Sequence, residues 1–362
     1  MKEFKFSTEA ALSVVSDDMK IICVEDINLH DDISIFDEYN IYGVLSCTRY
    51  YFDHKNIKLT PSGLSTAILN NVDESVLFIP SLDLNLSIER KTIDTTALHP
   101  YAKIICDEPF SEIKIVFVPN NEKTNEIIAQ NGLTCSCDEL KEIFANNFIY
   151  LSVEEVIFNM IEKREQLLEL ELLYIGQAQG RDIERNAVSR LKNHETLQKI
   201  LMDYHARHPN KRLYIMLFPF TENQIMMFNG IEDLPTFDNK DDVNHKNRLI
   251  QDAIAIRNND ENRKRQIINI TEAALINYFK PYYNTTFVNN FPSAGHSSYR
   301  HYYDLEYNLI VVELHRLYGV KVYTDTKSVF GERNFIEYEL FKDNRESIFN
   351  IFEHIKRADK QS

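Results

Sequence analysis

The sequence predicts an α+β protein, because short strands dominate its first part and helices alternate with strands after it. Segments such as NIYGVLSCTRYYF and EIKIVFVP are rich in Ile, Val, Phe and Tyr and are separated by turn-forming residues. From Ser152 onward, apolar residues recur first at helical and then at strand spacing. With 362 residues, 44% of them hydrophobic, the chain is long enough to bury more than one core.

These patterns predict three domains. Residues 1–147 form a β-rich, acidic domain, residues 148–290 a second domain with a polar insertion at about 221–268, and residues 291–362 a C-terminal α/β extension. The formal net charge is −15, and the first domain carries most of the acidic excess. Because such a surface repels duplex nucleic acid, we expect a regulatory role for it, through a protein partner or self-association.

Cysteine usage and hydropathy predict a cytoplasmic location. The five cysteines lie early in the chain, and the Cys135-x-Cys137 pair has no second Cys or His pair at zinc-finger spacing. We therefore expect reduced thiols. The N-terminus is charged and no run of eighteen apolar residues occurs, so we expect neither a secretory signal nor a membrane span.

The second domain begins with a helix and a strand. Ser152 followed three residues later by Glu155 predicts a capping box at the start of a helix. The alternation over residues 169–175 predicts a strand that ends at Gly176. A helical run from Arg181 to about residue 205 follows, with a break expected near Thr196.

Further elements are expected downstream. Residues 212–220 (RLYIMLFPF) form a continuous apolar run, which predicts a strand covered on both faces. Thr271 is the expected cap of a helix over residues 271–278, which Pro281 ends. YNLIVVEL and GVKVYT predict strands, and an amphipathic helix is expected at 345–356.

A set of motifs in the second domain occurs in a characteristic order. Tyr174-Ile175-Gly176 ends the predicted strand, Arg190 and His194 form an Arg-x-x-x-His pattern, Glu272 begins a helix, and Asn284 follows Pro281. This set resembles the GIY-YIG nuclease superfamily over roughly residues 170–287. The resemblance implies a small antiparallel sheet flanked by helices and a metal-dependent endonuclease activity.

The resemblance also implies a role for each residue. Glu272 would be the direct protein ligand of Mg²⁺ or Mn²⁺, a hard cation that one carboxylate and a phosphate can hold. Arg190 would grip the scissile phosphate with its planar donors. Tyr174 would act as general base or position the attacking water, His194 would share the phosphate, and Asn284 would steady the site through its amide.

Substrate contacts are expected around these residues. Basic side chains outnumber acidic ones within residues 178–215, which is the expected phosphate-facing surface. The family usually has a Gly-x-Tyr strand about eleven residues before its second tyrosine, where this chain has Lys163. Tyr150 is the best candidate for that missing tyrosine. The expected substrate-binding residues are Gly176, Arg181, Arg185, Lys192 and Asn284.

Alternatives stay open beside this hypothesis. Tyr174 can be a core aromatic, Glu272 can serve the helix dipole, and Asn284 can be a turn residue. The histidines at 296–301 fit structural or surface roles better than a zinc site. We expect DNA rather than RNA as substrate, in defence against foreign DNA or in genome maintenance. The alternatives are a noncatalytic nucleic-acid or protein interaction module with the same fold, and a regulatory or assembly protein that binds no nucleic acid.

Overall fold

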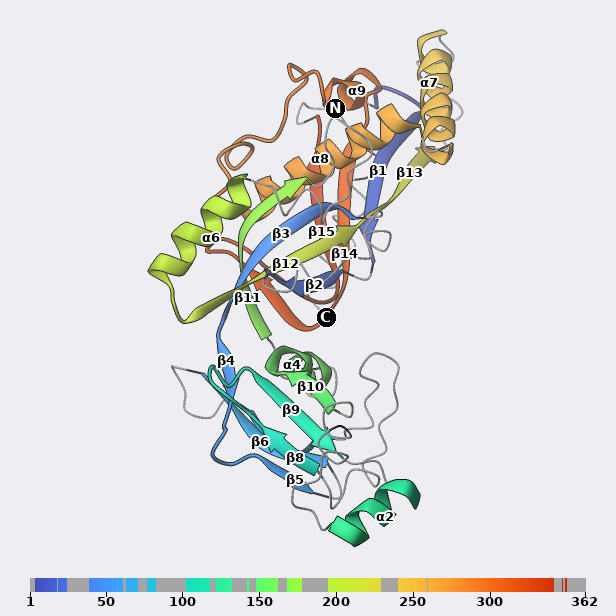
Figure 1. The fold of residues 1–362 in the computed structure, drawn as a ribbon. Coiled ribbons are helices and arrows are strands. Elements are labelled where there is room, and N and C mark those ends of the chain that lie inside the picture. Colours follow the sequence, from blue (N-terminus) through green and yellow to red (C-terminus); the bar gives the residue numbers. More distant parts are fainter. Residues whose placement is uncertain are drawn as a thin grey trace, which may run out of the picture. The chain divides into compact units, whose positions relative to one another are not determined.

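The chain folds into two compact units in the computed structural model. Unit 1 comprises Met1–Cys47 with Gln166–Ser362, and unit 2 comprises Thr48–Glu165. Both contain strands and helices, which confirms the α+β class (Figure 1). The structure describes residues 4–17, 19–24, 39–60, 63–70, 77–82, 102–117, 122–131, 142, 148–161, 168–177, 195–228, 240–258, 260–341, 347 and 349.

These units differ from the three predicted domains. The strands β1 (Thr8–Ser16), β2 (Lys20–Cys23) and β3 (Tyr39–Thr48) belong with the second half of the chain. The segment Thr48–Glu165 is thus an insertion between β3 and the next strand of unit 1. The predicted boundaries at 147/148 and 290/291 followed changes in composition, and composition does not record which distant strands pair.

Unit 1 is built on one mixed sheet. Its order is β13-β1-β14-β11-β3-β12-β2, and β15 pairs with β14. β1 runs parallel to β14 and antiparallel to β13, whereas β11 runs parallel to the end of β14 and antiparallel to β3. The strands not yet defined are β11 (Leu168–Gln177), β12 (Lys211–Pro219), β13 (Thr221–Phe228), β14 (Leu309–Tyr323) and β15 (Ser328–Glu339).

Two strands of this sheet confirm sequence predictions, and two predicted strands merge. β11 matches the alternating pattern, and β12 is buried over most of its length, as its apolar run predicted. YNLIVVEL and GVKVYT form the single strand β14 rather than two. The expected C-terminal extension is therefore part of the main sheet. The helix predicted at 345–356 falls almost entirely outside the described residues.

The helices α6 (Glu195–Arg207), α7 (Lys240–Arg257), α8 (Glu261–Phe279) and α9 (Arg300–Asp304) accompany the sheet. α8 packs against β11, β14 and β15, and α7 lies near β13 and β1 (Figure 1). The predicted helix start at Thr271 was wrong. Asp260 caps α8 by accepting a hydrogen bond from the Arg263 backbone N–H, and Thr271 is buried within the helix.

The expected polar insertion at 221–268 also has a different character. It supplies the edge strand β13, the whole of α7 and the first turns of α8. α7 buries Asp242, His245 and Asp252 together with Leu249 and Ile256. Its polar sequence therefore contains residues that dock the helix on the unit as well as residues that face solvent.

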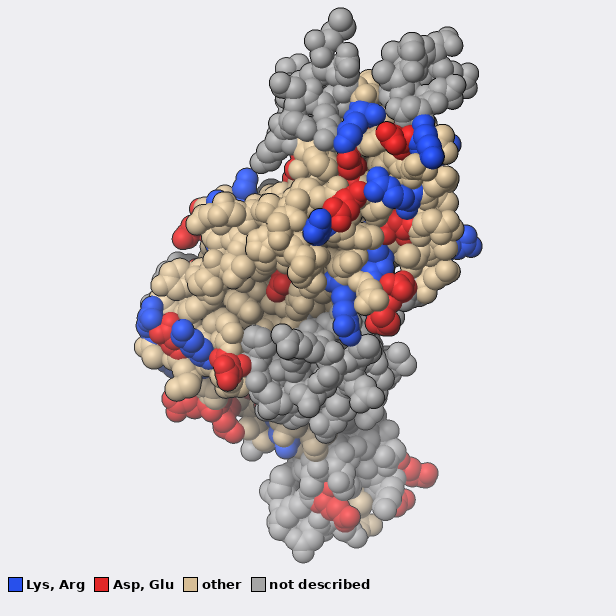
Figure 2. All heavy atoms as spheres, turned by 90° about the horizontal axis from the view of Figure 1, so that it is seen from above, with Lys and Arg blue, Asp and Glu red and all other residues tan. Residues whose placement is uncertain are grey.

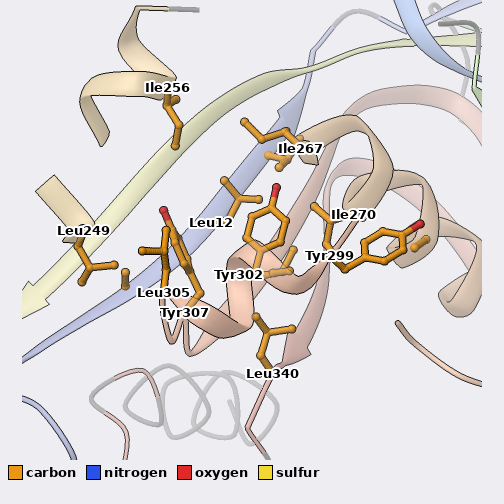
Figure 3. Packing of buried hydrophobic residues seen from close by; sticks show 14 residues of the cluster. Leu12, Leu249, Ile256, Ile267, Ile270, Tyr299, Tyr302, Leu305, Tyr307 and Leu340 are labelled. Atoms are coloured by element: carbon orange, nitrogen blue, oxygen red, sulfur yellow. The ribbon is translucent and has the colours of Figure 1, made fainter. Parts of the chain in front are cut away.

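Two apolar clusters stabilise unit 1. One joins β1, α7, α8, α9 and β14, with Tyr302 and Tyr307 both fully buried in it (Figure 3). The other joins β3, β11, α6 and β12 and includes Tyr42, Leu173 and Tyr204. Large aromatic side chains contribute much of the buried area in both, so each cluster fixes helices to the sheet.

Unit 2 consists of two small antiparallel sheets and helices. Ser152 and Glu155 form the predicted capping box at the start of α4, since each backbone N–H donates to the other side chain, at 2.8 and 3.2 Å. Among the described residues of the chain, no helix is long and apolar enough to cross a bilayer. The first sheet contains β4 (Tyr50–Phe52), β5 (Lys58–Thr60), β6 (Gly63–Asn70) and β7 (Leu77–Leu82), the second contains β8 (Ala102–Ile105), β9 (Glu112–Phe117) and β10 (Phe148–Ser152), and the helices include α2 (Glu122–Asn131) and α4 (Val153–Ile161).

Candidate functional site

The candidate site is centred on the end of β11, where this strand pairs with β3. Tyr42 of β3 lies opposite Gly176 of β11, and Tyr174 lies opposite Val44. The rings of Tyr42 and Tyr174 are 6.0 Å apart between centroids. Two tyrosines that are far apart in sequence are therefore neighbours on one face of the sheet.

Gly176 allows the two tyrosines to approach. A Cβ atom at this position would lie 2.7 Å from Tyr174 Cε1 and 2.9 Å from the Tyr42 hydroxyl oxygen. Both distances are shorter than van der Waals contact, so any larger residue would displace a tyrosine ring. The glycine of the Tyr-Ile-Gly motif thus has a packing role beside the tyrosines, in addition to the substrate contact expected for it.

Asn284 fixes the other edge of β11. Its Nδ2 donates to the Ile175 carbonyl at 2.8 Å, and its Oδ1 accepts from the Ile175 N–H at 2.9 Å. The neighbouring Tyr283 N–H donates to the Leu173 carbonyl at 3.0 Å. β14 pairs with β11 only as far as Glu171, so this loop supplies the partners that the end of β11 lacks.

Glu272 is bound to the last residue of β11. Gln177 Nε2 donates to Glu272 Oε2 at 2.7 Å and to Asn269 Oδ1 at 2.8 Å. Asn269 and Glu272 are three residues apart on α8, so they share one side of the helix. One amide therefore orients the carboxylate and ties α8 to the strand that carries Tyr174.

The position of Glu272 limits where a shared site can lie. Side chains alternate along a strand, so Tyr174 and Gln177 leave β11 on opposite faces. A site that uses both Tyr174 and Glu272 must therefore be at the end of β11 rather than on one face of the sheet. Tyr299, just before α9, is close to this region: burial and then the charge of Glu272 raise its pKa above the ordinary value.

The donor set at Glu272 fits a hard divalent cation. A partly buried carboxylate lies beside two amide side chains, and carboxylate and amide oxygens are ligands that Mg²⁺ and Mn²⁺ accept. Among the described residues, no three His, Cys, Asp or Glu side chains gather at a point where they could hold a metal ion.

The predicted phosphate-contacting residues Arg181, Arg185, Arg190, Lys192 and His194 lie outside the described residues. Their convergence with Tyr174 and Glu272 stays a prediction. In the described part of the same window, Arg207 pairs with Asp203, and Arg212 Nε donates to Cys23 Sγ at 3.1 Å. On the face in Figure 2, the described Lys and Arg side chains are interspersed with acidic ones rather than gathered in one patch.

Tyr150 and Tyr174 belong to different sheets. Tyr150 belongs to β10 of unit 2, pairs with Lys114 of β9, and has a relative exposure of 44%. The strand that pairs with β11 instead brings Tyr42, in the sequence Ile41-Tyr42-Gly43. The sequence alone does not single out Tyr42, because the family spacing places the first tyrosine shortly before Tyr174. The Ile-Tyr-Gly triplet itself was the available signal.

Tyr42 and Tyr174 differ in their surroundings. Tyr42 is 1% exposed in the cluster with Tyr39 and Leu173, whereas Tyr174 is only partly buried against the same cluster. Of the two, Tyr174 is thus the better placed to meet a ligand from solvent.

Comparisons of this chain with models of protein families, with curated proteins and with solved structures give no match.

Proposed function

We propose that unit 1 is a metal-dependent endonuclease that hydrolyses phosphodiester bonds of nucleic acid, with DNA as the preferred substrate. The observation that carries the proposal is the gathering of four predicted site residues around one strand end. Tyr174 and Gly176 lie on β11, Asn284 binds Ile175 between them, and Glu272 binds Gln177 directly after them. These residues come from segments about 100 positions apart in the chain, and they occur in the order that the family resemblance gives.

The proposed chemistry assigns a task to each side chain. Glu272, oriented by Gln177, would hold Mg²⁺ or Mn²⁺, which offsets negative charge on the phosphoryl oxygens. Arg190 would bind the scissile phosphate through its planar guanidinium. Tyr174 would position the attacking water, with Tyr42 packed beside it, and Asn284 would keep the strand end in place. His194 remains a proposed second phosphate contact.

A plasmid-nicking assay tests this function. Supercoiled plasmid is incubated with the full chain and Mg²⁺ or Mn²⁺, and the wild type is compared with Glu272→Ala, Glu272→Gln and Arg190→Ala. The matched control is Glu261→Ala, which removes an exposed carboxylate from the first turn of the same helix. We expect metal-dependent nicking that falls at least 100-fold in the three site variants and stays unchanged in the control.

Three outcomes have different consequences. Nicking that survives Glu272→Ala would end the assignment of this site. Binding of DNA without any cleavage would support the noncatalytic module instead, and absence of binding at low salt would support a regulatory or assembly protein. If nicking is found, the proposed setting is cytoplasmic defence against foreign DNA or genome maintenance, with the acidic segments recruiting or restraining the nuclease.

A further inference from the structure

A second polar site lies in unit 1, apart from the Glu272 carboxylate. A cavity of about 1110 Å³ opens between α7, α9 and the residues that precede β1. Its lining includes Lys5 and Phe6 at one side, the exposed side of α7, and His301 and Leu305 at the other. The cavity is thus large enough for a ligand of nucleotide size.

The floor of the cavity is a buried ionic network centred on Asp252. This carboxylate is 5% exposed and accepts hydrogen bonds from Arg263 Nη2 at 2.9 Å, from the Tyr307 hydroxyl and, at 2.8 Å, from a donor at His301 Nε2. Burial raises the pKa of Asp252, but these three partners outweigh it and hold the pKa below its ordinary value. Asp252 is therefore a charged orienting group for His301, with its own oxygens already occupied.

The network leaves His301 and Arg248 able to meet an anion. His301 donates from Nε2 to Asp252, and its Nδ1, which has no hydrogen-bond partner among the described residues, donates to an anion when the ring is in the imidazolium form. Arg248 donates one hydrogen bond to the Asp304 carbonyl and forms no ion pair with any described residue. A guanidinium carries five N–H donors in a fixed plane, so most of them remain for a ligand such as phosphate.

Amide side chains on α7 complete the lining. Asn244, Asn247 and Gln251 are exposed, line the cavity, and follow one another at intervals of three and four residues, so they share one side of the helix with Arg248. No described residue accepts from or donates to them. An amide presents a donor and an acceptor together, which is the pattern that matches the edges of nucleobases.

We infer that this cavity binds phosphate esters of nucleotides, with Arg248 and His301 contacting the phosphate and the α7 amides contacting a base. Most acidic groups nearby are paired: Glu306 with Lys5, Asp252 with Arg263 and Asp304 with Arg300, while Asp242 accepts hydrogen bonds from Ser7. Asp241 is the remaining carboxylate among the described residues that line the cavity. The ligand would be a segment of a nucleic-acid strand or a free nucleotide, which share this chemistry.

The ionic network under the cavity and the candidate nuclease site share helix α8, which carries both Arg263 and Glu272. Tyr299 feels the charge of Glu272, and His301, only two residues further along the chain, lines the cavity. Arg263 of the network and Glu272 are nine residues apart on α8, which corresponds to about 13 Å along the helix axis and about four nucleotide steps of a DNA strand. If the ligand is a segment of a nucleic-acid strand, the inference rests on the proposed function, and the cavity would hold the substrate near the cleavage centre.

Fluorescence anisotropy with the full chain tests the inference. The probe is a fluorescein-labelled 20-nucleotide DNA strand in EDTA, which prevents turnover. We expect Arg248→Ala to weaken binding about tenfold and to reduce the salt dependence by about one counterion, because one phosphate contact is lost. His301→Gln, which can still donate to Asp252, should weaken binding less. Arg257→Ala, which removes the same charge from the last turn of α7 outside the cavity, should have no effect.

Competition then identifies the source of the phosphate. Displacement of the probe by a nucleoside monophosphate, lost in Arg248→Ala, supports a nucleotide site, whereas displacement only by unlabelled strand supports a strand site. Equal effects of Arg248→Ala and Arg257→Ala, or equal displacement by a poly-Glu peptide, would overturn the inference. Plasmid nicking by the same variants keeps the two proposals separate: Glu272→Ala should abolish nicking and leave Arg248-dependent binding in place.

Discussion

Asn284 offers the sharpest test of how the candidate site is held together. Its side-chain amide makes two hydrogen bonds to the backbone of Ile175, whose side chain has a relative exposure of 0%. Asn284→Ala removes both bonds and leaves a buried N–H and a buried carbonyl without their partner. Each net bond contributes about 0.5–1.5 kcal/mol, and an unsatisfied buried group costs about 1–3 kcal/mol. We therefore expect a local destabilisation of about 2 kcal/mol at the end of β11.

Hydrogen–deuterium exchange of the β11 amides measures this directly. A loss of about 2 kcal/mol should speed exchange at Ile175 by about thirtyfold, since each 1.4 kcal/mol is a factor of ten. Asn284→Asp retains the acceptor but loses the Nδ2 donor and directs a carboxylate oxygen at the Ile175 carbonyl, so it should not restore protection. The control is Asn290→Ala, which changes an exposed asparagine of the same loop. Wild-type exchange rates in Asn284→Ala would refute the view that this amide holds the strand end.

Three further predictions concern packing, pH and buried charge. Gly176→Ala should lower stability by about 1–3 kcal/mol by displacing Tyr174 or Tyr42, whereas Gly295→Ala, whose Cβ would meet nothing closer than 3.7 Å, should stay within about 0.5 kcal/mol in thermal unfolding. His245 stacks on Phe6. Burial, and then the charge of Arg248, lower the pKa of His245 from 6.5. The opposing effects, which raise this pKa, come from Glu306, Thr8 and Asp242 and are outweighed. As the pH falls, His245 is therefore protonated in the unfolded chain before it is protonated in the folded chain. The free energy of unfolding is then unaffected by this group above about pH 6.5 and falls as the pH drops below it. His245→Phe should reduce the dependence of the free energy of unfolding on pH between pH 7.5 and 5.5. An unchanged pH dependence in this variant would contradict this assignment. Arg263→Met should cost about 3–5 kcal/mol in denaturant unfolding because it leaves Asp252 buried without its countercharge, and a near-neutral effect would show that His301 and Tyr307 suffice.

Sequence patterns predicted the local elements well wherever neighbouring residues decide the structure. The Ser152–Glu155 capping box, the strand that carries Tyr174 and the buried strand β12 all depend on contacts within a few positions. The start of α8 was placed too late, because its first turns are polar and resemble a loop when their buried partners are unknown. Arg263 is 3% exposed, and Asp252 on the preceding helix balances its charge.

The sequence by itself determined the α+β class, the strand and helix that carry Tyr174 and Glu272, and the order of the motifs. Only the tertiary structure decided that β3 pairs with β11, that Tyr42 lies beside Tyr174, and that Thr48–Glu165 is an insertion between these strands. The physical reason is that strand pairing joins residues more than 120 positions apart. Hydrophobic alternation shows that a strand will bury one face, but the choice of its partner depends on the packing of the whole unit.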